Sequence, residues 1–294
     1  MCSYDNVAQS TEIFADLTLL SPTNHEEGDT RVVLHSKDMI SKGYRRIVIR
    51  TVDTDVLVLM VSFFHELHVP DLHLWVDFGV GKNRELFSIN DISDALGPEK
   101  SLATRFFYGL TGVDQNSFFS HVTKHNAWKL WLVFPDITEA FAKLSSQPTL
   151  EEVRDIFPTV ERFVVLLYSR SSNALTCNDA RRELFCEGRS IDAIPPTSAA
   201  LFQHVLRAVF VTGYYWAQAT VSMQELPSPE DWGWKLVDDV YVPHWTELPE
   251  ASVALRDLVK CGCKNNTCRG NCKCIKSGDL PCTELCKCKG QCER

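Results

Sequence analysis

Two aspartates interrupt an otherwise apolar stretch of the sequence. Residues 51–59 read TVDTDVLVL, with the apolar run IVI (47–49) before the aspartates and VLVLMV (56–61) after them. An unpaired carboxylate is costly beside a hydrophobic core. Asp53 and Asp55 are two residues apart, and in an extended segment such residues point to the same side. They could therefore direct two carboxylates at one hard cation, such as Mg²⁺ or Mn²⁺.

Other acidic residues lie where predicted elements begin or end. Glu27 and Asp29 open a predicted helix, and Asp114 follows a later helix within TGVDQ. Carboxylates gathered from several element ends form the sites that hold Mg²⁺ or Mn²⁺. Two such ions can activate water and stabilise the leaving oxygen of a phosphodiester. The simpler alternative is that Glu27 and Asp29 favour a helix N-terminus and that Asp53 caps the next helix.

Most of the cysteines lie near the end of the sequence, in CGCKNNTCRGNCKCIKSGDLPCTELCKCKGQC. Both halves of this segment contain C-x3-C-x-C, and it has almost no large apolar residues, so disulfides or metal must supply its folding energy. An odd number of thiols and the lack of a secretory signal favour zinc thiolate ligation over a disulfide scaffold. The candidate zinc ligands are Cys261, Cys263, Cys268, Cys272, Cys274, Cys282, Cys286, Cys288 and Cys292.

Charge divides the chain near the same place. From Lys260 to Arg294, eight Lys and Arg oppose three Asp and Glu, a formal +5, so the remainder carries −8 − 5 = −13. We therefore expect three modules, over residues 1–135, 136–259 and 260–294. No apolar run of about 18 residues predicts a membrane-spanning helix, and the first residues do not resemble a signal peptide. An intracellular protein is expected.

Strands and helices alternate through the first module. Strands are predicted at 14–21, 44–53, 71–79 and 84–91, and helices at 24–43 and 54–69. Capping residues, closing glycines and β-branched runs set these bounds. The alternation predicts the α/β fold class, with a mainly parallel sheet and flanking helices. Ligands of such sheets bind at the carboxyl ends of the strands, where Asp53 and Asp55 lie.

In combination, these motifs resemble the PIN-like domain of the flap endonuclease/XPG nuclease group, over about residues 15–135. In that group an acidic pair opens a helix, D-x-D ends the next strand, and G-x-D follows a later helix. The corresponding segments here are EEGDTR, TVDTD and TGVDQ. The resemblance implies a nuclease with Mg²⁺ or Mn²⁺ as cofactor, whose catalytic residues are Glu27, Asp29, Asp53, Asp55 and Asp114.

The sequence departs from the nuclease pattern in two places. The group carries two further aspartates on an N-terminal region that includes the central strand, and nothing before FADLTLLS matches it, so we expect an N-terminally truncated domain. The glycine-bearing helical turn that grips duplex phosphates is replaced by SHVTKHNAW (120–128). Lys124 within this segment and Lys129 directly after it remain as candidate phosphate contacts. These departures leave open a non-catalytic protein built on a degenerate nuclease scaffold.

The cysteine spacing resembles the tesmin/TSO1-like CXC module. Nine thiolates fill the ligand positions of about three tetrahedral zinc ions if three sulfurs bridge, and that arrangement is known from this module. Members of the family often bind DNA, so the resemblance implies a DNA partner and a nuclear location. Asn271 stands where some members insert a tyrosine into the minor groove. The basic residues that could meet phosphates are Lys264, Arg269, Lys273, Lys276, Lys287 and Lys289, although they could equally form a solvated face.

Residues 136–259 predict a helical extension that ends in a tryptophan-rich segment. ERFVVLLYSR, CNDARRELFCEG and PPTSAALFQHVLRAVFVTGYYW carry apolar residues at helical spacing. His204 is expected in the core rather than at a metal. The tryptophans of PSPEDWGWK are expected to pack onto the body, with the stacking of bases as the alternative.

Two hypotheses follow for the whole chain. The first is a DNA-associated protein in which a PIN-like, divalent-metal-dependent nuclease domain is tethered to a zinc-binding CXC module. If active, it would be a structure-specific endonuclease in which an ion-bound water attacks the phosphodiester. The second is a non-catalytic nuclear protein that binds DNA or another protein.

Overall fold

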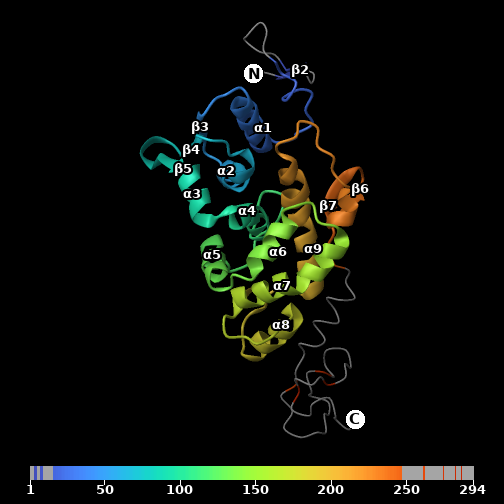
Figure 1. Cartoon of the computed structure of the whole chain (residues 1–294). Coiled ribbons are helices and arrows are strands. Elements are labelled where there is room, and N and C mark those ends of the chain that lie inside the picture. Colours follow the sequence, from blue (N-terminus) through green and yellow to red (C-terminus); the bar gives the residue numbers. More distant parts are fainter. Residues whose placement is uncertain are drawn as a thin grey trace.

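The computed structural model describes residues 3–4, 7–8 and 16–246, together with Cys261, Cys274, Cys282 and Cys286. This part of the chain is mixed α/β, with the main sheet, α1 and α2 at one end of the body and α7 and α8 at the other (Figure 1). The strands are β1 (Ser3–Tyr4), β2 (Val7–Ala8), β3 (Arg46–Thr51), β4 (His73–Phe78), β5 (Glu85–Ser88), β6 (Trp234–Val237) and β7 (Val240–Pro243). The α-helices are α1 (Gly28–Ser41), α2 (Thr54–Leu67), α3 (Ile89–Leu96), α4 (Pro98–Leu110), α5 (Lys124–Val133), α6 (Ile137–Leu144), α7 (Leu150–Tyr168), α8 (Cys177–Cys186) and α9 (Ser198–Val209). Shorter helical turns are η1 (Gly81–Asn83), η2 (Ile191–Ala193), η3 (Phe210–Tyr215), η4 (Trp216–Gln218) and η5 (Pro229–Trp232).

The main sheet has three strands in the order β3-β4-β5. β3 and β4 run parallel, with Ile47 beside Leu74, and α2 makes the crossover between them. β5 runs antiparallel to β4, with Val76 beside Phe87. The α/β class is therefore confirmed, whereas a mainly parallel sheet is not. The connection over residues 79–84 is too short for the crossover that parallel neighbours need, so the strands it joins are antiparallel.

The strand predicted over 14–21 is a turn in its described part. Asp16 Oδ1 accepts a hydrogen bond from the Thr18 N–H at 3.0 Å, and the Leu20 N–H donates to Leu17 O at 2.9 Å. An aspartate that binds the backbone two residues further on starts a turn rather than a strand. Leu20 is nevertheless buried, so the apolar pattern of this segment reflects burial and not extended geometry.

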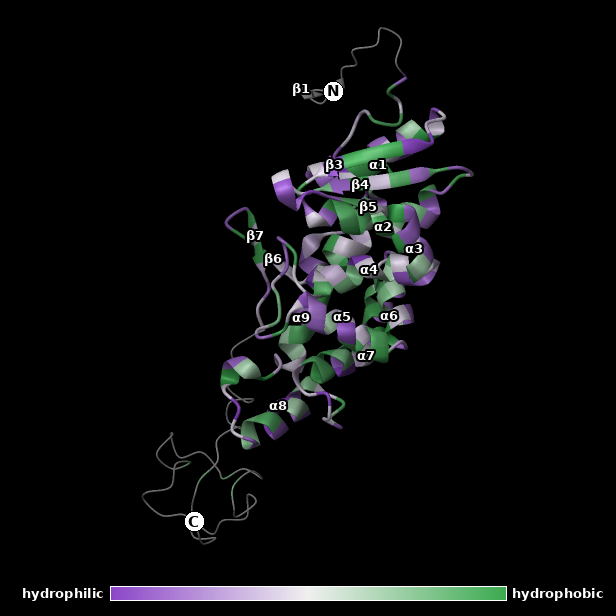
Figure 2. Ribbon diagram, turned by 90° about the vertical axis from the view of Figure 1, so that its left-hand side faces the viewer, coloured by the Kyte–Doolittle hydropathy of each residue, from purple (hydrophilic) through white to green (hydrophobic). Residues whose placement is uncertain are grey.

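Two hydrophobic clusters form the core. The first surrounds the main sheet and α2, where apolar stretches lie together in Figure 2, and it includes the fully buried Trp216 of η4. The second lies among the helices from α4 to α9. It joins residues on both sides of the expected 135/136 boundary, for example Trp131 and Phe141, whose ring centroids are 5.3 Å apart. That boundary therefore does not separate two cores.

The helical extension is present where the sequence indicates it, as α7, α8 and α9. α9 continues without a break into η3, a π-helical turn, and then into η4. This continuation returns the chain to the main sheet, because Tyr215 and Trp216 belong to the first hydrophobic cluster. His204 of α9 is 6% exposed and meets Leu110 O at 2.8 Å, as expected of a core histidine.

Gly79→Ala should destabilise the protein more than Gly43→Ala. Both glycines have a positive φ, +88° and +91°, where an added Cβ strains the backbone by about 1–2 kcal/mol. A Cβ at Gly79 would also lie 2.5 Å from Asn83 O, whereas nothing lies within 4 Å of one at Gly43. We expect urea denaturation to show a free energy of unfolding lower by a further ~1–3 kcal/mol for Gly79→Ala. Equal losses would mean that the 79–84 turn relaxes around the methyl group.

Candidate metal centre

Three of the predicted carboxylates converge at the N-terminal ends of two helices. Asp29 lies in the first turn of α1, Asp53 is the N-cap residue of α2, and Asp55 lies in its first turn. Oxygen atoms of the three lie within 4.8 Å of one another. α1 leads into the start of β3, and α2 begins where β3 ends. Because α1 runs back along the sheet, its first turn lies at the same edge as the first turn of α2. The connectivity of the elements therefore brings together residues that are 24 or more positions apart, since 53 − 29 = 24.

Asp53 and Asp55 meet in a different way from that expected of an extended segment. Asp53 Oδ1 accepts a hydrogen bond from the Asp55 N–H at 2.9 Å, which is an N-cap bond. The Asp53 N–H in turn donates to Thr51 Oγ1 at 2.9 Å. The pair thus spans the junction of strand and helix, and the capping role considered for Asp53 is real. It engages one carboxylate oxygen, so capping and metal binding are compatible.

Glu27 lies beside this group and is fixed from two distant parts of the chain. Its backbone N–H donates to the Tyr215 hydroxyl at 2.7 Å. Its carboxylate accepts a hydrogen bond from Gln115 Nε2. Glu27 is the N-cap residue of α1, but its side chain makes no capping hydrogen bond to the helix.

Asp114 is presented by a tight turn after α4. The backbones of Val113 and Asn116 exchange hydrogen bonds of 2.9 and 3.0 Å across this turn. The buried Asn116 side chain also donates to Gly109 O at 3.0 Å, which anchors the turn to the helix. Gly112 has φ +116°, and a Cβ there would lie 2.9 Å from Phe118 Cβ. The TGVDQ motif therefore encodes a specific backbone shape that leaves Asp114 exposed.

Burial and repulsion by neighbouring carboxylates raise the pKa of Glu27, Asp29 and Asp55. The pKa of Asp55 rises from 3.8 to about 6, first because of burial and then because of Asp53. Burial also raises the pKa of Glu27 and of Asp29, and Asp114 contributes to all three shifts. All five predicted carboxylates thus interact electrostatically. A divalent cation would relieve this repulsion, and its preferred ligands are carboxylate oxygens, so the residues fit Mg²⁺ or Mn²⁺.

Lys124 lies close to the cluster but faces the protein. Its ammonium donates to Tyr108 O at 3.0 Å, to Thr111 Oγ1 at 3.2 Å and to Gly112 O. It also lies 3.8 Å from the centroid of the Tyr108 ring. Burial lowers its pKa to about 8. These contacts tie α5 to the carboxyl end of α4, so the predicted phosphate contact is a structural one in this conformation.

The other predicted phosphate contacts differ in their setting. Lys129, in the same helix α5, is exposed and remains accessible to a phosphate. The six basic residues of the tail, Lys264, Arg269, Lys273, Lys276, Lys287 and Lys289, lie outside the described residues.

Sequence reasoning missed the residues that support the carboxylates. The Tyr108 hydroxyl lies 2.5 Å from Thr54 Oγ1 and thereby links α4 to the start of α2. Burial raises the pKa of Tyr108 to about 12, so it stays neutral beside Asp55. Tyr108 and Gln115 flank the TGVD motif, and their closeness to it in the sequence is a signal that could have identified them as supporting residues. Tyr215 comes from η3, and no local sequence signal connects it with Glu27.

A cavity of about 330 Å³ adjoins Glu27. Its lining includes Glu26, Glu27, Gln115, Tyr215, Trp234 and Tyr241. The expected packing of the PSPEDWGWK tryptophans holds for Trp232, which is 3% exposed, with its ring centroid 4.7 Å from that of Tyr214. Trp234 is only partly buried and lines the cavity, so the stacking alternative stays open for this residue.

Four of the nine predicted zinc ligands form a second cluster. Cys261, Cys274, Cys282 and Cys286 are buried, and their sulfur atoms lie within 4.8 Å of one another. The Sγ atoms of Cys274 and Cys286 are 3.7 Å apart, well beyond the ~2.05 Å of a disulfide bond. Four thiolates can hold a tetrahedral metal ion, and zinc is the metal they suit best. The other five, Cys263, Cys268, Cys272, Cys288 and Cys292, lie outside the described residues.

Comparison with known proteins adds no relative: no family model, no curated protein and no solved structure matches this chain. Within residues 3–4, 7–8 and 16–246, no helix combines the length and the apolar character needed to cross a bilayer.

Asp55→Asn should stabilise the metal-free protein at about pH 7 and remove its response to metal. Because the pKa of Asp55 is raised from 3.8 to about 6, its ionisation costs folding free energy, and the cost appears as the pH rises from about 4 through 6. Removing the charge should add on the order of 1–2 kcal/mol to the free energy of unfolding at pH 7, after allowance for solvent screening, and little at pH 4.

Thermal denaturation with and without Mn²⁺ tests this expectation. Wild-type protein should melt higher with Mn²⁺ at pH 7 and respond less at pH 5, where protons compete for the carboxylates. Asp91→Asn is the matched control, because Asp91 is an exposed aspartate in the first turn of α3. Equal Mn²⁺ shifts in Asp55→Asn and wild type would argue against a metal centre here.

For the tail, elemental analysis of purified protein should give about three zinc ions per chain, as nine thiolates with bridging sulfurs require. Cys286→Ser should lose at least one ion, since it removes one of four clustered ligands. Cys186→Ser is the control, because Cys186 is an exposed cysteine of α8. A single zinc ion in the wild type would contradict the three-ion cluster, and unchanged zinc in Cys286→Ser would contradict the four-sulfur set.

Proposed function

We propose that this protein hydrolyses phosphodiester bonds of nucleic acid with a divalent metal ion, and that its cysteine-rich tail is a zinc-binding CXC module that places it on DNA. The observation that carries the proposal is the convergence of Asp29, Asp53 and Asp55. In addition to burial, Asp114 is near enough to raise the pKa of Asp29 and Asp55, and Asp29, Asp55 and Asp114 in turn raise the pKa of Glu27. Such a cluster is costly without a cation, and phosphodiester hydrolysis is a chemistry that carboxylate-bound divalent ions perform.

The chain's own residues divide the work. Asp29, Asp53 and Asp55 would hold the ion, which when bound supplies an activated water and neutralises charge on the phosphate. Glu27 and Asp114 would complete the oxygen set from the two flanking segments. The hydrogen bonds to Glu27 from Tyr215 and Gln115 suit a positioning role, because they fix its backbone and its carboxylate.

The adjoining cavity favours nucleic acid over a small phosphate ester. Its aromatic lining, with Trp234 and Tyr241, lies beside Glu27 and would therefore face the neighbourhood of a phosphate bound by the ion. Nucleases and base-modifying enzymes must accommodate the bases next to the bond they act on, and aromatic side chains stack on any base. At about 330 Å³ the cavity is in the range of small-ligand sites.

The tail would supply the affinity for DNA that the acidic body lacks. The body carries a formal −13 outside residues 260–294, from −8 − 5, whereas the tail carries +5 before metal is counted. Its lysines and arginine would contact phosphates, and a nuclear location would follow from a DNA partner.

A non-catalytic binding protein is the second candidate, and the structure of the α4–α5 region favours it. The Lys124 ammonium is engaged by backbone oxygens instead of reaching outward. His121, in the place of the phosphate-gripping turn, has φ +59° and pairs with Asp192 at 3.1 Å. A metal-binding scaffold with a poor surface for duplex phosphates would fit that arrangement.

Cleavage of flap and gapped DNA in the presence of Mg²⁺ or Mn²⁺ tests the two candidates. Asp53→Ala/Asp55→Ala should lower the rate by at least about 100-fold, because it removes two ion ligands. Asp91→Ala, which deletes an exposed carboxylate from the first turn of α3, should leave the rate unchanged. Absence of cleavage by the wild type, or cleavage that survives the double substitution, would leave the binding protein as the better description.

A further inference from the structure

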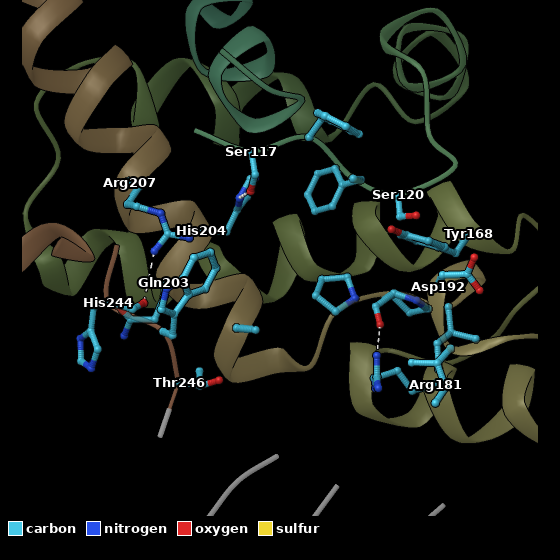
Figure 3. A pocket seen from close by; sticks show the side chains of 18 residues that line it. Ser117, Ser120, Tyr168, Arg181, Asp192, Gln203, His204, Arg207, His244 and Thr246 are labelled. Carbon is cyan, nitrogen blue, oxygen red and sulfur yellow. Dashed lines mark hydrogen bonds between the residues drawn. The ribbon is translucent and has the colours of Figure 1, made fainter. Parts of the chain in front are cut away.

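A second cavity, of about 290 Å³, lies away from the carboxylates. It is bounded by residues 117–120, by the neighbourhood of α8 and η2, by α9, and by residues 244–246 (Figure 3). It shares no lining residue with the cavity beside Glu27. Its chemistry also differs, because it is lined by two arginines in a body whose formal charge is strongly negative.

Arg207 contributes a buried guanidinium without a carboxylate partner. The residue is 4% exposed, and its Nη1 donates to Gly233 O at 3.1 Å and to His244 O at 3.3 Å. No described carboxylate forms an ion pair with it. Its Nε and Nη2 have no hydrogen-bond partner among the described residues, and the residue lines the cavity.

Arg181 brings a second guanidinium to the opposite side of the cavity (Figure 3). One of its nitrogens donates to Pro195 O, while its Nε is buried and lacks a hydrogen-bond partner. The one carboxylate among the described lining residues is Asp192, which is 66% exposed at its side chain and pairs with His121 at 3.1 Å. Neither arginine is therefore neutralised by the described part of the protein.

The walls of the cavity are aromatic. Trp245 is 66% exposed, and its ring centroid lies 5.6 Å from the Arg207 guanidinium carbon. Phe118 also lines the cavity and is 76% exposed, and Tyr168 lies on the same side of the cavity as Arg181 (Figure 3). Large aromatic side chains this exposed beside uncompensated cationic groups mark a surface for a ligand with both a ring and a negative charge.

We propose that this cavity binds a phosphorylated nucleoside, with the phosphate held by Arg181 and Arg207 and the base stacked on Trp245 or Phe118. Buried charges in proteins are ordinarily paired, so two guanidinium groups that have no carboxylate partner among the described residues suit an anion. Guanidinium forks match phosphate oxygens, and aromatic rings stack on any base. The nucleoside can be a free nucleotide or the terminal nucleotide of a strand, since both present the same groups.

Isothermal titration of the zinc-loaded full chain with dAMP, without Mg²⁺ or Mn²⁺, tests the proposal independently of cleavage. Wild-type protein should bind dAMP saturably and adenosine at least tenfold more weakly. Arg181→Gln should weaken dAMP binding at least tenfold, as the loss of a charge-assisted hydrogen bond implies. Arg182→Gln, its neighbour on α8 in an exposed ion pair with Asp179, should bind as wild type does.

Further variants separate the two parts of the ligand. Trp245→Ala should weaken dAMP but leave inorganic phosphate unaffected, because it removes the stacking surface alone. Arg207→Gln should weaken the binding of both dAMP and inorganic phosphate. Because Arg207 also donates to two backbone carbonyls, the melting temperature of this variant is measured as well. If Arg207→Gln unfolds, the result for Arg181→Gln decides the test. Lack of saturable dAMP binding by the wild type, or equal affinities of Arg181→Gln and Arg182→Gln, would overturn the proposal.

The source of the nucleotide is settled by one more comparison. A single-stranded oligonucleotide with a 5′-phosphate should compete with dAMP, and its 5′-hydroxyl counterpart should not, if the cavity holds the end of a strand. Competition by neither oligonucleotide would identify a free nucleotide as the ligand. Asp53→Ala/Asp55→Ala should bind dAMP normally, so failure of the nuclease proposal and failure of this one give different results.

Discussion

Repulsion among carboxylates at the N-terminal ends of α1 and α2 is the constraint around which this end of the molecule is organised. Asp29, Asp53 and Asp55 are held together, although burial and the neighbouring carboxylates both oppose the ionisation of Asp29 and Asp55. Helix N-termini offset part of the cost, because their unpaired N–H groups favour negative charge. The N-cap bond from Asp55 to Asp53 is one such offset. The remaining repulsion is what a bound cation would remove.

The parts of the chain that hold this cluster come from far along the sequence. Tyr108 of α4 forms a hydrogen bond with Thr54 at the start of α2. Lys124 of α5 donates a hydrogen bond to a backbone carbonyl near the end of α4. Tyr215 fixes Glu27 from a π-helical turn, an irregularity that is common at functional sites. The helical extension is thus part of the support of the site, and the shared core across the expected 135/136 boundary has the same origin.

Charge is distributed so that different surfaces suit different ligands. The carboxylate end suits cations, the cavity with Arg181 and Arg207 suits an anion, and the four clustered cysteines suit zinc. These three environments lie on one chain with a formal charge of −8. Net charge alone would have indicated a poor partner for nucleic acid, whereas the local arrangement places carboxylates and guanidinium groups at separate sites.

The sequence by itself determined the elements that local signals encode: α1 and α2 with their acidic first turns, the β-branched strands β3 and β4, and the cysteine-rich tail. Spacing was also sufficient to nominate the carboxylates, because element ends in an α/β unit meet at one edge of the sheet. It failed for β5, whose direction depends on the length of a turn, and for residues 16–21, where Asp16 starts a turn. Only the tertiary structure decided that Lys124 faces inward, that Tyr215 supports Glu27, and that Arg181 and Arg207 share a cavity. Such contacts depend on how distant segments pack, and neither propensity nor periodicity carries that information.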